Sequence, residues 1–128
     1  MANPREVKYS KTYAWVKPEN NEALVGITDY AQQQLGSILF VEVARPGDKI
    51  TQDAPCGTIE SDKSTSDVVA PVSGEVVAVN QDAIDAPETI NEDPYGKGWL
   101  LRVRMSNPSE LDHLLSADEF DQFIVSEE

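Results

Sequence analysis

The stretch over residues 56–79 constrains the fold most strongly, because two apolar runs flank a short polar turn and a third run follows. A single lysine, Lys63, stands in that turn. Short apolar runs bounded by turn residues are typical of β-strands. The stretch therefore predicts a β-hairpin with Lys63 at its tip, then a turn over 71–74 and another strand.

Most of the remaining chain consists of similar short runs that are rich in β-branched and aromatic residues. Turn residues such as proline, glycine and asparagine separate these runs. This pattern predicts a mainly β fold, a barrel or a sandwich, in a single domain over residues 1–128. Besides the hairpin, we expect strands over 11–16, 22–27, 38–43 and 99–105, with a turn over 18–21.

A few short helices are expected around the strands. Thr28 is a good N-cap for a helix that runs to about Leu35, and Gly36 fits the left-handed position after its end. Residues 107–110 form one possible capping box, with Pro108 at the first helical position. Residues 116–119 form a second capping box, which predicts a helix at the C-terminus.

The chain is strongly acidic, with 23 Asp and Glu residues against ten Lys and Arg residues and a net charge of -13. This charge repels a phosphate backbone or an anionic membrane surface, so we expect no nucleic acid or membrane partner. No apolar run reaches the roughly 18 residues of a membrane span. An acidic surface favours solubility, and it also favours fast encounter with basic protein surfaces.

Few residues have the pattern of a catalytic or metal site. The one cysteine, Cys56, can form neither a disulfide within the chain nor a zinc site, and its apolar neighbours predict a place in the core. The one histidine, His113, is expected on the surface near a helix end. Trp15 and Trp99 are expected to pack in the core. We therefore predict no catalytic residue and no metal site.

Lys63 is the remaining candidate. Its neighbours include Glu60, Ser61, Asp62 and Asp67, which keep the amine hydrated and favour its charged form. Such surroundings argue against a catalytic lysine, which is usually desolvated. They suit a lysine on a projecting turn that another enzyme reaches and acylates.

Several blocks of the sequence resemble the glycine cleavage system H proteins. Residues 60–67 and 70–80 closely resemble the lipoylation region of that family. Residues 25–32 resemble its Val-Gly-Ile-Thr-x-x-Ala block, and residues 91–100 resemble its Asn-x-x-Pro-Tyr-x-x-Gly-Trp block. The blocks occur in order across about residues 9–124, which makes the resemblance specific.

The resemblance implies a barrel-sandwich hybrid, a flattened β-barrel with a few short helices. It also implies lipoate linked covalently to Lys63 as N6-lipoyl-lysine, with Glu60, Ser61 and Asp67 as flanking residues that are recognised with it. A protein of this kind is a non-catalytic carrier whose lipoyl arm shuttles the aminomethyl group left by glycine decarboxylation.

The partners implied by the resemblance are a pyridoxal-phosphate glycine decarboxylase, a tetrahydrofolate-dependent aminomethyltransferase and dihydrolipoamide dehydrogenase. A lipoyl ligase or transferase would attach the cofactor. We expect a monomer in the bacterial cytoplasm, or in the mitochondrial matrix if the chain is a processed eukaryotic protein.

The sequence departs from the family pattern in two places, which keeps alternatives open. Tyr13 and Ala14 stand where the family usually has His-Glu before Trp15, and the residues beside Lys63 are more polar than usual. An H-like paralogue that carries or relays lipoate for another pathway is therefore the alternative. A non-carrier binding module is a third possibility. A biotin carrier is disfavoured because no Met flanks Lys63.

Overall fold

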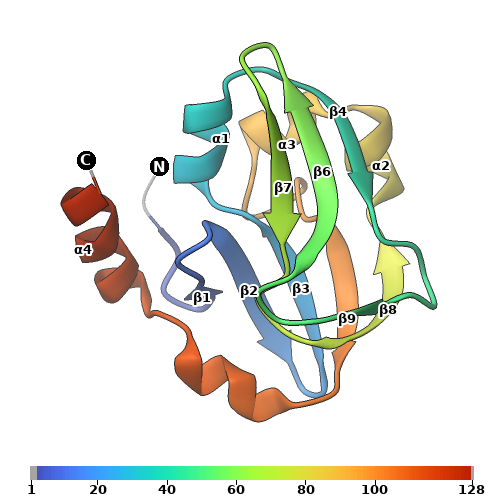
Figure 1. Ribbon diagram of the computed structural model, residues 1–128, viewed down its shortest axis with the longest axis vertical. Coiled ribbons are helices and arrows are strands. Elements are labelled where there is room, and N and C mark those ends of the chain that lie inside the picture. Colours follow the sequence, from blue (N-terminus) through green and yellow to red (C-terminus); the bar gives the residue numbers. More distant parts are fainter. Residues whose placement is uncertain (1–2, 128) are drawn as a thin grey trace.

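A computed structural model describes residues 3–127 and contains two β-sheets that enclose a common core (Figure 1). The larger sheet has the spatial order β1 (Lys8–Tyr9), β2 (Ala14–Glu19), β3 (Glu22–Ile27), β9 (Leu101–Met105), β8 (Gly74–Val79) and β5 (Lys49–Ile50). The smaller sheet has the order β4 (Ile38–Val43), β6 (Pro55–Ser61) and β7 (Thr65–Val69). All pairings within the two sheets are antiparallel.

Short helices lie around the sheets, as the sequence predicts. They are α1 (Asp29–Leu35), α2 (Gln81–Asp85), α3 (Glu88–Glu92), the 3-10 helix η1 (Pro108–His113) and the terminal helix α4 (Ala117–Glu127). The mainly β fold with a C-terminal helix is thereby confirmed. No helix within residues 3–127 is long and apolar enough to cross a membrane.

The main core lies between the two sheets and follows the two-residue alternation of the strands. In β3 and β9 every second side chain is buried, so each of these strands directs one face toward the core. The opposing sheet contributes Val41, Ile59 and Val68. Burial of such aliphatic side chains is the main favourable contribution to folding, at about 25 cal/mol per Å² of apolar surface.

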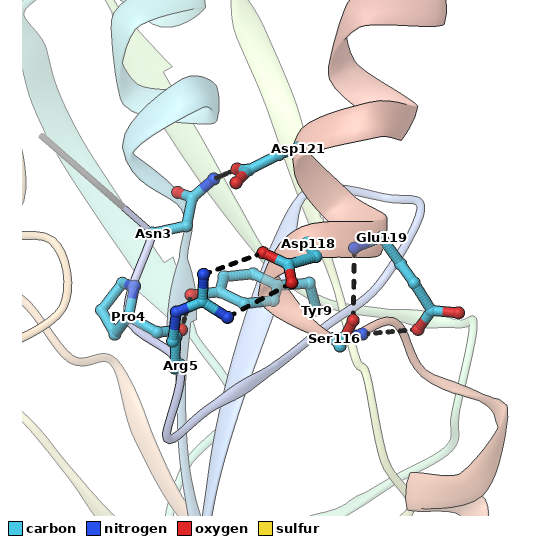
Figure 2. A network of polar contacts seen from close by, with 8 residues as sticks. All are labelled: Asn3, Pro4, Arg5, Tyr9, Ser116, Asp118, Glu119 and Asp121. Carbon is cyan, nitrogen blue, oxygen red and sulfur yellow. Dashed lines mark hydrogen bonds and ion pairs between the residues drawn. The ribbon is translucent and has the colours of Figure 1, made fainter.

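A second, smaller cluster joins the N-terminal segment to α4. The rings of Tyr9 and Phe120 are stacked with their centroids 4.8 Å apart, and Trp15 Nε1 donates a hydrogen bond to Pro94 O (3.0 Å). Polar contacts surround this cluster, including an ion pair between Arg5 and Asp118 at 3.1 Å (Figure 2). The terminal helix is therefore attached to the body by both apolar and polar contacts.

Three predicted boundaries differ in the structure. The strand predicted over 11–16 begins only at Ala14, because Tyr13 has a φ of 71° that no regular strand contains. The same strand continues through Pro18, where a turn was predicted. Strand β1 pairs with β2 only as far as Val16, so Pro18 lies on an edge where its missing N–H is tolerated. The strand predicted over 99–105 begins at Leu101.

Only one of the two predicted capping boxes forms. At the start of α4, Ser116 N donates to Glu119 Oε1 (2.8 Å) and Glu119 N donates to Ser116 Oγ (3.2 Å), as predicted. Asn107 makes no side-chain cap to η1, so that prediction is wrong. The Glu110 carboxylate instead accepts hydrogen bonds from Ser73 N (2.7 Å) and Ser73 Oγ (2.8 Å), a contact distant in sequence.

We predict that Ser116→Ala lowers the free energy of unfolding by about 1 kcal/mol, because the variant loses the hydroxyl that caps α4. The matched change Asn107→Ala should cost less, since Asn107 caps no helix. Urea unfolding of both variants measures the difference. Equal losses would contradict the assignment of the two caps.

Candidate functional site

Lys63 lies in the three-residue turn between β6 and β7, at the tip of the hairpin at the top of Figure 1. The last pair of residues in register before the turn is Glu60 and Thr65. The Lys63 side chain is exposed, and within residues 3–127 no carboxylate forms an ion pair with its amine. The predicted hairpin is thus present, and its lysine is accessible from solvent.

Ser61 fixes the conformation of the turn. Its backbone N–H donates to Ser64 O (2.8 Å) and closes the hairpin. Its hydroxyl oxygen lies 3.2 Å from Lys63 N and 3.1 Å from Ser64 N, both of which donate to it, and the hydroxyl donates to Ser64 O (3.0 Å). Such local side-chain hydrogen bonds are characteristic of turns formed by Ser. Ser61 therefore shapes the backbone that carries Lys63.

The turn also rests on the C-terminal end of α1. Asp62 N donates to Ser37 O (3.0 Å). Gly36 precedes Ser37 and has a φ of 79°, as predicted for the residue after the helix. A Cβ at Gly36 would lie 2.7 Å from Asp62 Oδ1 and 3.3 Å from Lys63 Cε, so these two side chains would have to move aside, and the positive φ itself favours glycine at this position. The base of the Lys63 side chain is therefore supported by α1.

Asn91, from α3, holds this support in place. Its Oδ1 accepts from Ile38 N (2.9 Å), and its Nδ2 donates to Gly36 O (2.8 Å) and to Gln32 Oε1 (2.8 Å). The side chain thus binds the backbone on both sides of Ser37. The resemblance to the family includes Asn91, but nothing local in the sequence indicates a contact with a residue 53 positions away.

The other two predicted flanking residues lie on the strands rather than in the turn. Glu60 is exposed on β6 between Phe40 and Thr65 in the register of the small sheet. Asp67 is exposed on β7, opposite Thr58. Ser61 is therefore the only one of the three that contacts the Lys63 backbone directly among the described hydrogen bonds.

A cleft of about 220 Å³ lies beside the hairpin, between α1 and β7. Most of its lining is aliphatic or aromatic, and Ser66 and Asp67 contribute polar groups. Tyr13 and Tyr30 line it with their ring centroids 5.3 Å apart. The β7 side of the cleft begins three residues after Lys63, so a long apolar group on that lysine has a suitable surface nearby. The cleft has no signature in the sequence, because its lining comes from separate elements.

Cys56 and His113 take no part in this site. His113 is exposed at the end of η1, as predicted. Cys56 is buried in the main core, and burial raises the pKa of its thiol to about 11. A thiol with such a pKa is almost fully protonated near neutral pH and reacts poorly.

We predict that Cys56 in the folded chain reacts with a disulfide reagent at pH 8 about a hundredfold more slowly than in the urea-unfolded chain, because burial protects the thiol and disfavours the thiolate. The absorbance of the released thiolate measures both rates. Similar rates would show that the thiol is accessible.

We also predict that Asn91→Leu lowers the free energy of unfolding by about 2–3 kcal/mol, because it leaves Ile38 N and Gly36 O without their partner. The matched variant Asn21→Leu, at an exposed turn position, should change stability by less than about 0.5 kcal/mol. Denaturant unfolding measures both variants. Amide exchange at Asp62 should accelerate in Asn91→Leu, and unchanged exchange would contradict the proposed support of the turn.

Comparison with known proteins gives a consistent result. The glycine cleavage H-protein family model matches residues 7–127. The chain is 46% identical to the glycine cleavage system H protein of Carboxydothermus hydrogenoformans, over 97% of this chain and 95% of the relative. It is 47% identical to the protein of the same name from Halalkalibacterium halodurans, over 99% of this chain and 100% of the relative.

A solved structure agrees with these relatives. The crystal structure of a glycine cleavage system H protein from Mycobacterium marinum superposes with a TM-score of 0.87 at 36% identity, and the match covers 94% of this chain and 97% of that one. The predicted barrel-sandwich hybrid is thereby confirmed. The near full-length matches do not favour the paralogue that Tyr13 and Ala14 had suggested. The chain belongs to the glycine cleavage H-protein family.

Proposed function

We propose that the chain is the lipoyl carrier of glycine cleavage, with lipoate joined by an amide bond to Lys63. The observation that carries the proposal is the exposed Lys63 on a fixed three-residue turn, in a chain of this family. An exposed amine on a projecting turn is open to an acylating enzyme. The hydrogen bonds of Ser61 hold the backbone on which that enzyme would act.

The surroundings of Lys63 fit a lipoyl group. The lysine amine is free of ion pairs within residues 3–127, and the adjacent cleft offers apolar side chains to the hydrocarbon part of the group. When attached, lipoate supplies a disulfide that can take up the aminomethyl group derived from glycine. Ser61 and the Gly36–Ser37 backbone keep the base of the arm in one place. Asp67, at the edge of the cleft, supplies a negative charge near the arm.

The chain itself acts as a non-catalytic carrier in this proposal. Its partners are the pyridoxal-phosphate glycine decarboxylase, the tetrahydrofolate-dependent aminomethyltransferase, dihydrolipoamide dehydrogenase and a lipoyl ligase or transferase. Tethering the reacting group to one flexible arm raises its effective concentration at each active site. The net charge of -13 would steer the carrier toward basic surfaces on these enzymes. The bacterial relatives support a place in the bacterial cytoplasm.

We predict that incubation with a bacterial lipoate ligase, lipoate and ATP adds one lipoyl group to the purified chain. Lys63→Arg should abolish the addition, because the guanidinium is a poor nucleophile. The matched change Lys97→Arg, at another exposed lysine, should leave the addition intact. Intact-mass spectrometry reads all three samples. Modification of Lys63→Arg, or a wild-type chain that stays unmodified, would refute the proposed attachment site.

A further inference from the structure

Strand β4 exposes two consecutive large apolar side chains. Leu39 is 62% exposed and Phe40 is 54% exposed, whereas Ile38 and Val41 on either side are buried. Neighbouring residues of a regular strand point to opposite faces, so one of the pair should be buried. Among residues 3–127, the other large apolar side chain with comparable exposure is Val125 on α4.

A β-bulge explains this exposure. The pairing of β4 with β6 passes from Ile38 opposite Ser61 to Phe40 opposite Glu60, so Leu39 is an extra residue without a partner across the ladder. A bulge changes the direction of a side chain and commonly occurs beside functional sites. Here the bulge directs the side chains of both Leu39 and Phe40 to solvent, so neither side chain contributes to the core.

These two side chains lie close to the carrier lysine. Ile38 pairs with Ser61, and Ser37 O accepts from Asp62 N, so β4 begins beside the turn. Leu39 and Phe40 are the next residues along the strand. At about 3.3 Å per residue, they lie within roughly 10 Å of the turn backbone.

Acidic side chains flank this apolar pair. Glu60 lies directly opposite Phe40, and Glu42 follows two residues later on the same face of β4; both are exposed. Neither forms an ion pair in the part of the chain that the structure describes. The nearest base along β4 is Arg45, beyond the end of the strand. The complementary surface is therefore an apolar pocket with Lys or Arg residues at its edge.

We propose that Leu39, Phe40, Glu42 and Glu60 form the docking surface for the enzyme that attaches lipoate to Lys63. The proposal rests on the proposed function. That enzyme must bring its active site to the lysine amine itself, so it must cover the turn and the adjoining part of the small sheet. Enzymes that use the finished arm meet its far end and need not cover this surface. A groove of about 280 Å³ between β4 and α2, lined in part by Phe40 and Ile84, extends the surface away from the turn.

The reaction at this surface is amide formation. An ATP-dependent ligase activates the lipoate carboxyl group as its adenylate and releases pyrophosphate. Lys63 Nζ then attacks the carboxyl carbon and AMP leaves; of the three protons of the lysine ammonium group, two pass to solvent and one stays on the amide nitrogen. Docking next to the lysine holds the amine near the activated carboxyl group, which should lower the KM for the carrier more than it changes kcat.

The test measures steady-state lipoylation with a bacterial lipoate ligase while the concentration of the unmodified chain is varied. The double variant Leu39→Ser/Phe40→Ser should raise the KM for the chain about tenfold or more, with kcat little changed. Val125→Ser, which removes an apolar side chain on α4 that is 71% exposed, should leave the KM unchanged. Thermal unfolding of each variant checks that the fold is intact.

Charge variants test the acidic edge of the surface. Glu42→Lys and Glu60→Lys, made as separate single variants, should each raise the KM at low salt, and the difference from the wild type should shrink as ionic strength rises. Asp112→Lys is the matched control, because Asp112 is exposed on η1, away from the hairpin (Figure 1). An increase in KM for Asp112→Lys as large as the increase for Glu42→Lys or Glu60→Lys would show that only net charge matters and would overturn the surface proposal.

The possible failures are distinguishable. A wild-type chain that accepts no lipoate overturns the proposed function and this inference together. A wild-type chain that is lipoylated, with unchanged KM in the Leu39 and Phe40 variant, overturns the docking surface alone. The variant is also driven to full lipoylation with excess ligase and assayed for glycine-dependent carbon dioxide exchange. Exchange at the wild-type rate by this fully lipoylated variant supports the proposal. A loss of exchange by the same sample would assign the surface to the decarboxylase instead.

Discussion

The hydrogen bond from Asp62 N to Ser37 O connects the lysine turn to the body of the protein. Without it, the pairing of β6 with β4 would end at Ser61 and Ile38, and residues 62–64 would be ordered only by hydrogen bonds within the hairpin. The bond depends on Gly36, whose positive φ leads the chain from α1 into Ser37, and on Asn91, which holds the backbone on both sides of Ser37. A long flexible arm is useful to a carrier when its attachment point is fixed, and these contacts fix it.

The two sheets provide the rigidity that these contacts need. The hairpin belongs to the small sheet, whose inner face packs on the large sheet through residues such as Ile59 and Val68. The same small sheet presents Phe40 and Glu60 outward beside the turn. The small sheet thus contributes core residues, the attachment point and the neighbouring outer surface. This arrangement suits a protein that several enzymes must approach from outside.

Local features could be predicted from the sequence, because neighbouring residues determine them. The lysine turn, the Thr28 cap and the Ser116 capping box are examples, and the cap appears as the bond from Ala31 N to Thr28 Oγ1 (3.2 Å). Contacts between distant segments could not be predicted in this way. Glu110 fits a capping-box pattern in the sequence. In the structure, however, its carboxylate accepts a hydrogen bond from Ser73, which is 37 residues away.

The bulge at Leu39 could not be predicted from the sequence, for a similar reason. The run over 38–43 is almost continuously apolar, so its composition does not reveal which side chains face the core. The register with β6 decides that question. The cleft beside β7 likewise forms only when α1, β2 and the hairpin come together. Family resemblance indicated the site at Lys63, whereas its supports became visible only in three dimensions.

The most direct test of the carrier role is glycine-dependent carbon dioxide exchange with a purified glycine decarboxylase. The lipoylated chain should support exchange that rises with its concentration, and Lys63→Arg treated in the same way should support only the background rate. Exchange by Lys63→Arg equal to that of the wild type, or no exchange by the fully lipoylated chain, would contradict the central claim.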